Sequence, residues 1–238
     1  MTLADVRGIY MVHTMLQREL GLMPELVRTV ASGDVDRARV VTEHIELVAD
    51  LLRQHDLVEE RHLWPRLLDR LPAEAAPLVR AMEREHRLVD DLQERLEPAL
   101  AAWRIAAGQA GREAVAAVLD ALILALADHL AREEDRVLPL AARCVTTAEW
   151  AEMLADGARC FDLDSLVLFC GMIRYDADPA VFRATVESMP ETLRAVVFER
   201  CEQAFAEYAL GVYGTATPPH APGPPSFDDG PCSLPGIA

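Results

Sequence analysis

Apolar residues recur at helical spacing over four long stretches of the chain, which predicts four amphipathic helices. The first stretch begins near Thr2 and runs to about Val30, after which Ser32-Gly33-Asp34 turns the chain. In the second, from about Val35 to Leu71, apolar residues keep a period of 3.6 with arginines and acids at the other positions. Pro65 is expected to kink the last turns of this second helix.

The third and fourth stretches repeat this arrangement. Residues 72–77 restart the pattern, and Pro77 suits a first helical turn. Gly108 and Gly111 break the chain before the fourth helix, expected over about Arg112 to Arg143. Because short turns join these helices, we expect an all-α fold, an up-down four-helix bundle over residues 1–145.

The pattern changes after residue 145. Thr146-Thr147-Ala148-Glu149 has the sequence of a capping box. Shorter helices are predicted near 147–156, 163–173, 179–188 and 190–211, forming a C-terminal helical extension over residues 146–213. The apolar side chains of the extension could cap the bundle or form a dimer surface, and we expect capping. Residues 214–238 are rich in proline, lack hydrophobic periodicity and are predicted to be a disordered tail.

The composition narrows the classes of function. The 238 residues carry a formal net charge of -16 and include no lysine. Such an acidic chain argues against partners such as nucleic acid or an anionic membrane, and without lysine there is no Walker loop or pyridoxal Schiff base. The most apolar run, Ala114–Ala127, is interrupted by Asp120 and is too short to span a bilayer. We expect a cytoplasmic protein whose partners are small neutral molecules, cations or metals.

One motif occurs twice: a histidine, acids four and five residues later, and a proline ten residues later. It runs from His55 to Pro65 and from His129 to Pro139. A given histidine would meet this pattern by chance with a probability on the order of 0.002. A second pair, His13 and His86, precedes the motifs by 42 and 43 residues, so the two halves superpose at a shift of 73 to 74 residues. The chain therefore reads as a duplicated helical hairpin.

Each motif brings metal-binding side chains to one helix face. Residues four apart lie on the same face, so each motif directs an imidazole and a carboxylate toward the bundle centre. His13 and His86 face them from the partner helices. Four histidines and two carboxylates suffice for two metal ions, and mixed nitrogen and oxygen ligands suit iron or manganese better than calcium. His44 and His62 lie two or three helical turns from His55 and are expected to be hydrogen-bonded outside this site.

The sequence resembles the hemerythrin-like, or HHE cation-binding, family over about residues 1 to 143. The residues that carry the resemblance are His13, His55-x3-Glu59, His86 and His129-x3-Glu133, with the neighbours Glu60 and Glu134 and the endings Leu63-Trp64-Pro65 and Val137-Leu138-Pro139. The resemblance implies a non-heme centre of two Fe ions, and manganese or a mixed pair would use the same residues. It also implies that Glu59 and Glu133 bridge the ions, which the histidines bind in the pairs His13 with His55 and His86 with His129.

One position departs from the oxygen-carrying members of that family. Those have a further histidine one turn after the third ligand, where this chain has Asp90. Asp90 is either a carboxylate ligand or points away and leaves water on that iron. Both alternatives lower the number of nitrogen ligands on that iron. Anionic oxygen ligands stabilise Fe(III), which favours one-way oxidation over reversible oxygen release. Glu60 and Glu134 are expected beside the ligands or in solvent, and Tyr10, one turn before His13, is a candidate to line the oxygen pocket.

Three functions remain open. The preferred one is an enzyme, a diiron oxidase or peroxidase that reduces O2, peroxide or NO or uses them to oxidise a small organic substrate. It needs a polar-lined pocket beside the metals, for which Tyr10 and His44 are candidates. The alternative is a non-catalytic protein that binds or senses O2, NO or iron, with the extension passing on the state of the site. In the third, the extension serves as a surface for a partner or a homo-oligomer.

Overall fold

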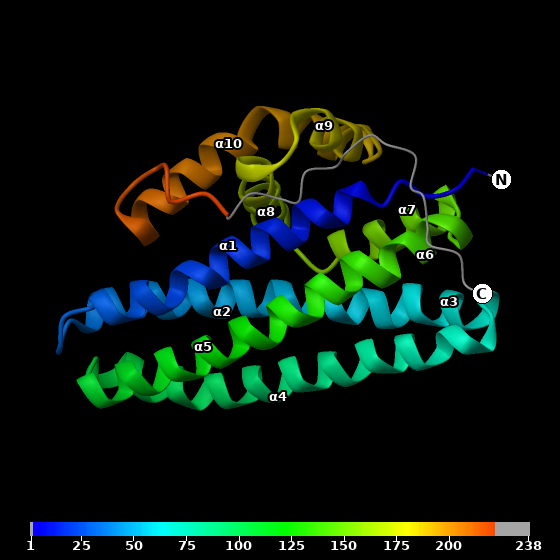
Figure 1. Cartoon of the computed structure of the whole chain (residues 1–238). Coiled ribbons are helices and arrows are strands. Elements are labelled where there is room, and N and C mark those ends of the chain that lie inside the picture. The colour runs from blue at the N-terminus through cyan, green and yellow to red at the C-terminus, as the bar shows by residue number, and fades with distance from the viewer. Residues whose placement is uncertain (1, 222–238) are drawn as a thin grey trace.

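Four long helices form the predicted up-down bundle in the computed structural model, which describes residues 2–221 (Figure 1). The first half of the bundle pairs α1 (Arg7–Thr29) with α2 (Val35–Val58), and the second half pairs α4 (Ala76–Ala106) with α5 (Gln109–Arg132). Apolar side chains of all four helices form one buried core. Of the tail predicted to be disordered from residue 214 onward, residues 214–221 are described, and the Pro218 carbonyl there accepts a hydrogen bond from the Tyr175 hydroxyl at 2.8 Å. Residues 222–238 lie outside the described residues.

The start of the first helix differs from the prediction. The helix begins at Arg7 rather than near Thr2, and its N-cap Val6 makes no side-chain cap. The residues before it pair with the start of the extension instead, because Leu3 and Thr146 form an isolated antiparallel bridge. The backbone carbonyl of Thr2 also accepts a hydrogen bond from the Thr147 N–H at 3.0 Å. A long-range contact therefore replaces the local helix start.

Both copies of the repeated motif contain a π-helical turn that begins at the first glutamate. α2 continues into η1 (Glu59–Leu63) and α3 (Trp64–Arg70), while α5 continues into η3 (Glu133–Val137) and α6 (Leu138–Cys144). The motif's proline has no N–H, and its ring would clash with the carbonyl four residues earlier. The residue before each proline donates its N–H five residues back, to the carbonyl of Glu59 or Glu133. The disturbance expected at Pro65 thus takes the form of a wider turn at the glutamate.

The helix over Gln109–Cys144 is long and apolar enough to cross a membrane by length and composition alone, contrary to the expectation from the interrupted run. In this structure it packs in the bundle, where Leu119, Leu122 and Leu126 are buried. Its fully buried residues include His129 and Glu133, whose side chains face the bundle interior. A core helix of a bundle has the same composition as a membrane span.

The extension lies along the first half of the bundle, above α1 and α2 in Figure 1. It consists of α7 (Thr147–Ala158), α8 (Leu163–Asp176), the short helix α9 (Pro179–Glu187) and α10 (Glu191–Tyr213). The predicted capping box is present, with Thr146 and Glu149 bonding each other's backbone N–H. Phe169 of α8 and Phe205 of α10 belong to the buried core of the bundle. The extension therefore caps the bundle, as expected.

A buried ion-pair network joins the extension to α1. Arg18 and Glu19 are almost fully buried. The Arg18 guanidinium pairs with the carboxylates of Glu19 and Asp176 and donates to the backbone carbonyl of Met172 at 2.9 Å. Asp176 and Met172 belong to α8, so this network connects residues of two helices that lie more than 150 positions apart in the sequence.

His44 of α2 continues this network, as a hydrogen-bonded histidine outside the predicted metal site. Its Nδ1 lies 3.0 Å from the Tyr208 hydroxyl and its Nε2 lies 2.9 Å from the Tyr213 hydroxyl, both from α10. The Tyr213 hydroxyl also donates to Glu19 at 2.5 Å. Burial lowers the pKa of His44 to about 4. A neutral imidazole therefore links α10 to the bundle at neutral pH.

Candidate metal centre

Seven side chains from the bundle helices form two groups in which every ligand atom lies within 4.8 Å of the others. The first group is His13, His55, Glu59 and Glu133, and the second is Asp56, Glu59, His86 and His129. Glu59 belongs to both. The structure thus brings together all six residues predicted as metal ligands and adds Asp56.

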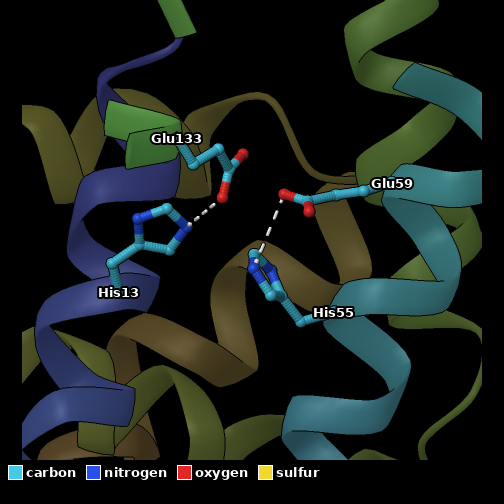
Figure 2. Close-up of side chains that lie close together, drawn as sticks. All are labelled: His13, His55, Glu59 and Glu133. Carbon is cyan, nitrogen blue, oxygen red and sulfur yellow. Dashed lines mark ion pairs between the residues drawn. The ribbon is translucent and has the colours of Figure 1, made fainter. Parts of the chain in front are cut away.

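The first group gathers side chains from α1, α2 and the two π turns (Figure 2). His13 Nε2 lies 3.4 Å from Glu133 Oε2, and His55 Nε2 lies 3.5 Å from Glu59 Oε1. Figure 2 shows both imidazoles and both carboxylates pointing into one space between the helices. This is an arrangement of two nitrogens and two carboxylates around a common centre.

The second group lies between α2, α4 and α5. His86 Nε2 is 3.6 Å from Glu59 Oε2 and 3.8 Å from Asp56 Oδ1. His129 Nε2 is 3.2 Å from His86 Nε2 and 3.8 Å from Glu133 Oε2. Glu133 Oε2 therefore faces His13 of one group and His129 of the other, while Glu59 offers one oxygen to each group.

Eight polar atoms of these groups are buried without a hydrogen-bond partner in the structure. They are Nε2 of His13 and His55 and both carboxylate oxygens of Asp56, Glu59 and Glu133. A buried polar atom left unpaired costs about 1–3 kcal/mol, and more when it is charged, so proteins rarely leave several together. Buried carboxylates are normally paired or bind a metal. The donor set fits cations of borderline hardness, such as iron or manganese.

Burial shifts the pKa of four of these side chains in the direction that favours the neutral form. It raises the pKa of Glu59 and Asp56 well above their usual values, and the neighbouring Glu133 and Asp90 carboxylates respectively add to the shift. It lowers the pKa of His55 well below its usual value and that of His129 to about 3. The imidazoles of His55 and His129 are therefore neutral, as metal ligands must be, and a bound cation would favour the ionised carboxylates.

The outer nitrogens of three histidines face carboxylates. Nδ1 of His13 lies 2.8 Å from Glu134 Oε1, and Nδ1 of His86 lies 3.1 Å from Glu60 Oε1. His129 Nδ1 lies 3.3 Å from Glu85 Oε2. An Nδ1–H that donates to a carboxylate leaves the Nε2 lone pair directed at the centre and raises its basicity. Glu60 and Glu134 thus lie beside the ligands, one of the two alternatives left open by the sequence.

Other residues singled out in the sequence lie apart from the two groups. Asp90 belongs to neither group in the described part of the chain, and burial followed by the Glu60 charge raises its pKa. Tyr10 packs beside His13, with ring centroids 6.5 Å apart, and its hydroxyl donates to the Glu134 carbonyl at 3.3 Å. His62 lies 3.0 Å from Asp156 of α7, outside the centre as predicted.

Asp56 is the site residue that the sequence reasoning missed. It follows His55 directly and lies three residues before Glu59, so it shares a helix face with that glutamate. A signal was present in the repeat, because the corresponding residue after His129 is Leu130. Leu130 is fully buried, so the carboxylate at the corresponding position of the first half is expected to be buried as well. A buried carboxylate needs a cation or a hydrogen-bond donor as its partner.

A pocket of about 560 Å³ reaches the centre from the side of the extension. It lies between α1 and α2 on one side and α7, α8 and α9 on the other, and His55 and Glu59 form part of its wall. The expectation of a polar lining with Tyr10 and His44 is wrong, since most of its described lining residues are apolar and neither of those two is among them. His44 faces the tyrosines of α10 instead.

Comparison with known proteins gives one match. The family model of the hemerythrin HHE cation-binding domain matches residues 5–141. No curated protein and no solved structure matches the chain. The matched range holds every residue of the two ligand groups and ends before the extension.

Proposed function

The chain belongs to the hemerythrin HHE cation-binding family, and from this premise we propose that it is a non-heme diiron protein that carries out redox chemistry on O2, peroxide or NO. One observation carries the proposal: two His/carboxylate groups share Glu59 within a buried centre. A pair of iron ions bound there would supply the electrons that no protein side chain can supply alone. A small organic molecule is the proposed second substrate.

The ligand residues of the chain have separable roles in this proposal. His13 and His55 hold one ion, His86 and His129 hold the other, and Glu59 with Glu133 connects the two groups. Glu134, Glu60 and Glu85 orient the imidazoles through Nδ1 and keep the proton on that nitrogen. Full burial of Glu59 and Glu133 keeps bulk water from the centre.

Asp56 favours oxidation over reversible carriage. It adds a third carboxylate to four histidines, without counting Asp90. Anionic oxygen ligands stabilise the ferric state, so a centre built this way releases oxygen less readily than a nitrogen-rich one. A non-catalytic role in binding or sensing O2, NO or iron is the alternative, and its support is the direct packing of the extension on the core of the bundle that carries the ligands.

Metal loading tests the proposal. The full-length protein is loaded with Fe(II) without oxygen, iron is counted per chain, and the optical spectrum is followed as oxygen is added and then removed. We expect about two irons per chain, irreversible oxidation and turnover of added peroxide. Return of the starting spectrum would favour the binding or sensing function.

Matched variants test whether the iron counted per chain is bound at this site. His55→Ala and His129→Ala are expected to lose iron, whereas His62→Ala, a histidine outside the centre, should keep the parent's count. Retention of two irons by both ligand variants would contradict the proposal.

A further inference from the structure

The pocket beside the centre indicates what kind of molecule it serves. We propose that a neutral, apolar small molecule binds between the first half of the bundle and the extension, with one end against His55 and Glu59. Its role as the molecule oxidised rests on the proposed function, whereas its binding requires only the pocket.

The walls of the pocket are apolar on both sides. α1 and α2 contribute Met11, Met15 and Leu51, and the extension contributes Leu166 and Phe182 among others. The volume of about 560 Å³ lies within the range of small-molecule sites, which are mostly apolar with a few polar groups. Such a surface favours a ligand through the apolar area removed from water.

The pocket meets the centre at a single histidine. The side chains of His13, His86 and His129 are fully buried, whereas that of His55 is 6% exposed and forms part of the pocket wall together with Glu59. A molecule in the pocket would therefore approach the group of His13, His55, Glu59 and Glu133 from the His55 side.

The corresponding positions in the second half of the bundle carry charged residues instead of this apolar wall. At the shift of 73 to 74 residues, Val12 and Val58 of the pocket correspond to Glu85 and Arg132. In the second half these two residues form an ion pair, and Glu85 also faces Nδ1 of His129. In the first half, valines replace the ion pair at the positions that the extension covers. The replacement removes charge from the side of the centre that faces the pocket.

The charges around the pocket select a neutral molecule. Among its described lining residues Arg159 is the only arginine, and its guanidinium already donates to Asp156 at 2.9 Å. No free cation is therefore offered there to a carboxylate or phosphate group. The inner end carries Glu59, and the chain as a whole has a net charge of -16, which further disfavours an anion.

Dye binding to the full-length protein tests the site without any turnover. The probe is N-phenyl-1-naphthylamine, a neutral apolar dye whose fluorescence rises on burial, added to protein with and without Fe(II) under nitrogen. We expect one saturable site per chain and at least tenfold weaker binding to Ala158→Trp, which fills the pocket. Ala184→Trp, the same change at an exposed position outside the pocket on α9, should bind like the parent. Equal binding by parent and Ala158→Trp would overturn the proposal.

Two further measurements keep the test independent of the folding of one variant. Val12→Glu, which restores the residue found in the second half, should also weaken the dye at least tenfold while circular dichroism stays unchanged. 1-Decanol should displace the dye at least ten times more effectively than decanoate from metal-free protein. Equal or better displacement by decanoate would overturn the assignment to neutral molecules.

Placement against the centre is tested with paramagnetic Mn(II), which the same ligands suit. Mn(II)-loaded protein should strongly enhance the proton relaxation of bound 1-decanol, and Ala158→Trp should abolish this effect. Dye binding without metal binding would refute the proposed function alone, whereas metal binding without dye binding would refute the pocket alone. Binding of both without relaxation enhancement would refute the placement at His55.

Discussion

The two halves of the bundle carry the same ligand pattern, but each half depends on the other to orient it. Glu134 of the second half lies 2.8 Å from Nδ1 of His13, and Glu60 of the first half lies 3.1 Å from Nδ1 of His86. The acid five residues after the histidine of each motif therefore faces Nδ1 of a histidine of the opposite half. A duplicated hairpin of this kind forms its centre only when both copies pack together.

The halves differ most in what surrounds these shared ligands. The first half has Asp56 where the second has Leu130, and it has the apolar pocket wall where the second has a charged pair. Its outer side also carries the extension, which Arg18 and Glu19 anchor. The halves thus share the histidines and glutamates of the repeat and differ in what surrounds them on one side of the centre.

Glu59→Ala should have the largest effect on the centre, because Glu59 belongs to both ligand groups. We expect the metal content to fall from about two ions to less than one per chain, as measured by elemental analysis after dialysis. Glu152→Ala, an exposed acid on α7, is the control and should retain both ions. Full occupancy in Glu59→Ala would show that the two halves bind metal independently.

Arg18→Leu should have the largest effect on stability. It leaves Glu19 and Asp176 buried without their cation, so we expect the free energy of unfolding in urea to fall by about 3–5 kcal/mol. Asp91, at the corresponding position of the second half, is exposed. Asp91→Leu should change the free energy of unfolding by less than about 0.5 kcal/mol. Similar losses in both variants would remove the contrast between the halves.

Asp56→Leu gives the first half the residue found in the second. The second ligand group loses a carboxylate, and we expect one of the two ions to bind about 10–100 times more weakly, by analogy with the loss of other residues that tune a metal site. Competition with a chelator measures the two affinities. Unchanged affinity of both ions would exclude Asp56 as a ligand.

The same variant predicts a pH dependence of the metal-free protein. The unfolded chain releases the Asp56 proton near pH 3.8, whereas burial holds it in the folded protein, where the pKa lies well above that value. The contribution of Asp56 to stability is therefore lost as the pH rises from about 4 to the folded pKa. Relative to Asp56→Leu, the parent should lose up to about 1.4 kcal/mol per pH unit in this window, measured by urea unfolding. A constant difference would contradict the raised pKa.

Glu134→Gln and Glu60→Gln should have the smallest effects. Each replaces a carboxylate that faces Nδ1 of a histidine by a neutral amide, and we expect roughly tenfold weaker metal binding. Glu134→Gln should cost more, because the Glu134 side chain is 19% exposed against 41% for Glu60 and water screens the more exposed charge. A larger effect in Glu60→Gln would reverse this order.

The sequence pattern by itself determined the bundle and six of the seven candidate ligands. The 3.6-residue period and the spacing of four between histidine and glutamate are local properties of a helix, so they follow from residues close together in the chain. The same reasoning was wrong about the first helix start, because Leu3 pairs with Thr146 rather than continuing the helix.

Only the tertiary structure decided which groups meet across helices. The contact of Glu134 with His13 spans 121 residues, and the pocket joins α1 and α2 to the helices of the extension. The roles proposed for Asp56 and for the apolar wall depend on these contacts. Helical periodicity shows on which face of its helix a residue lies, but it does not show what packs against that face. The four side chains of the two motifs were therefore predictable from local spacing, and His13 and His86 from the internal repeat. The asymmetry of the centre and the access to it depend on packing between distant segments.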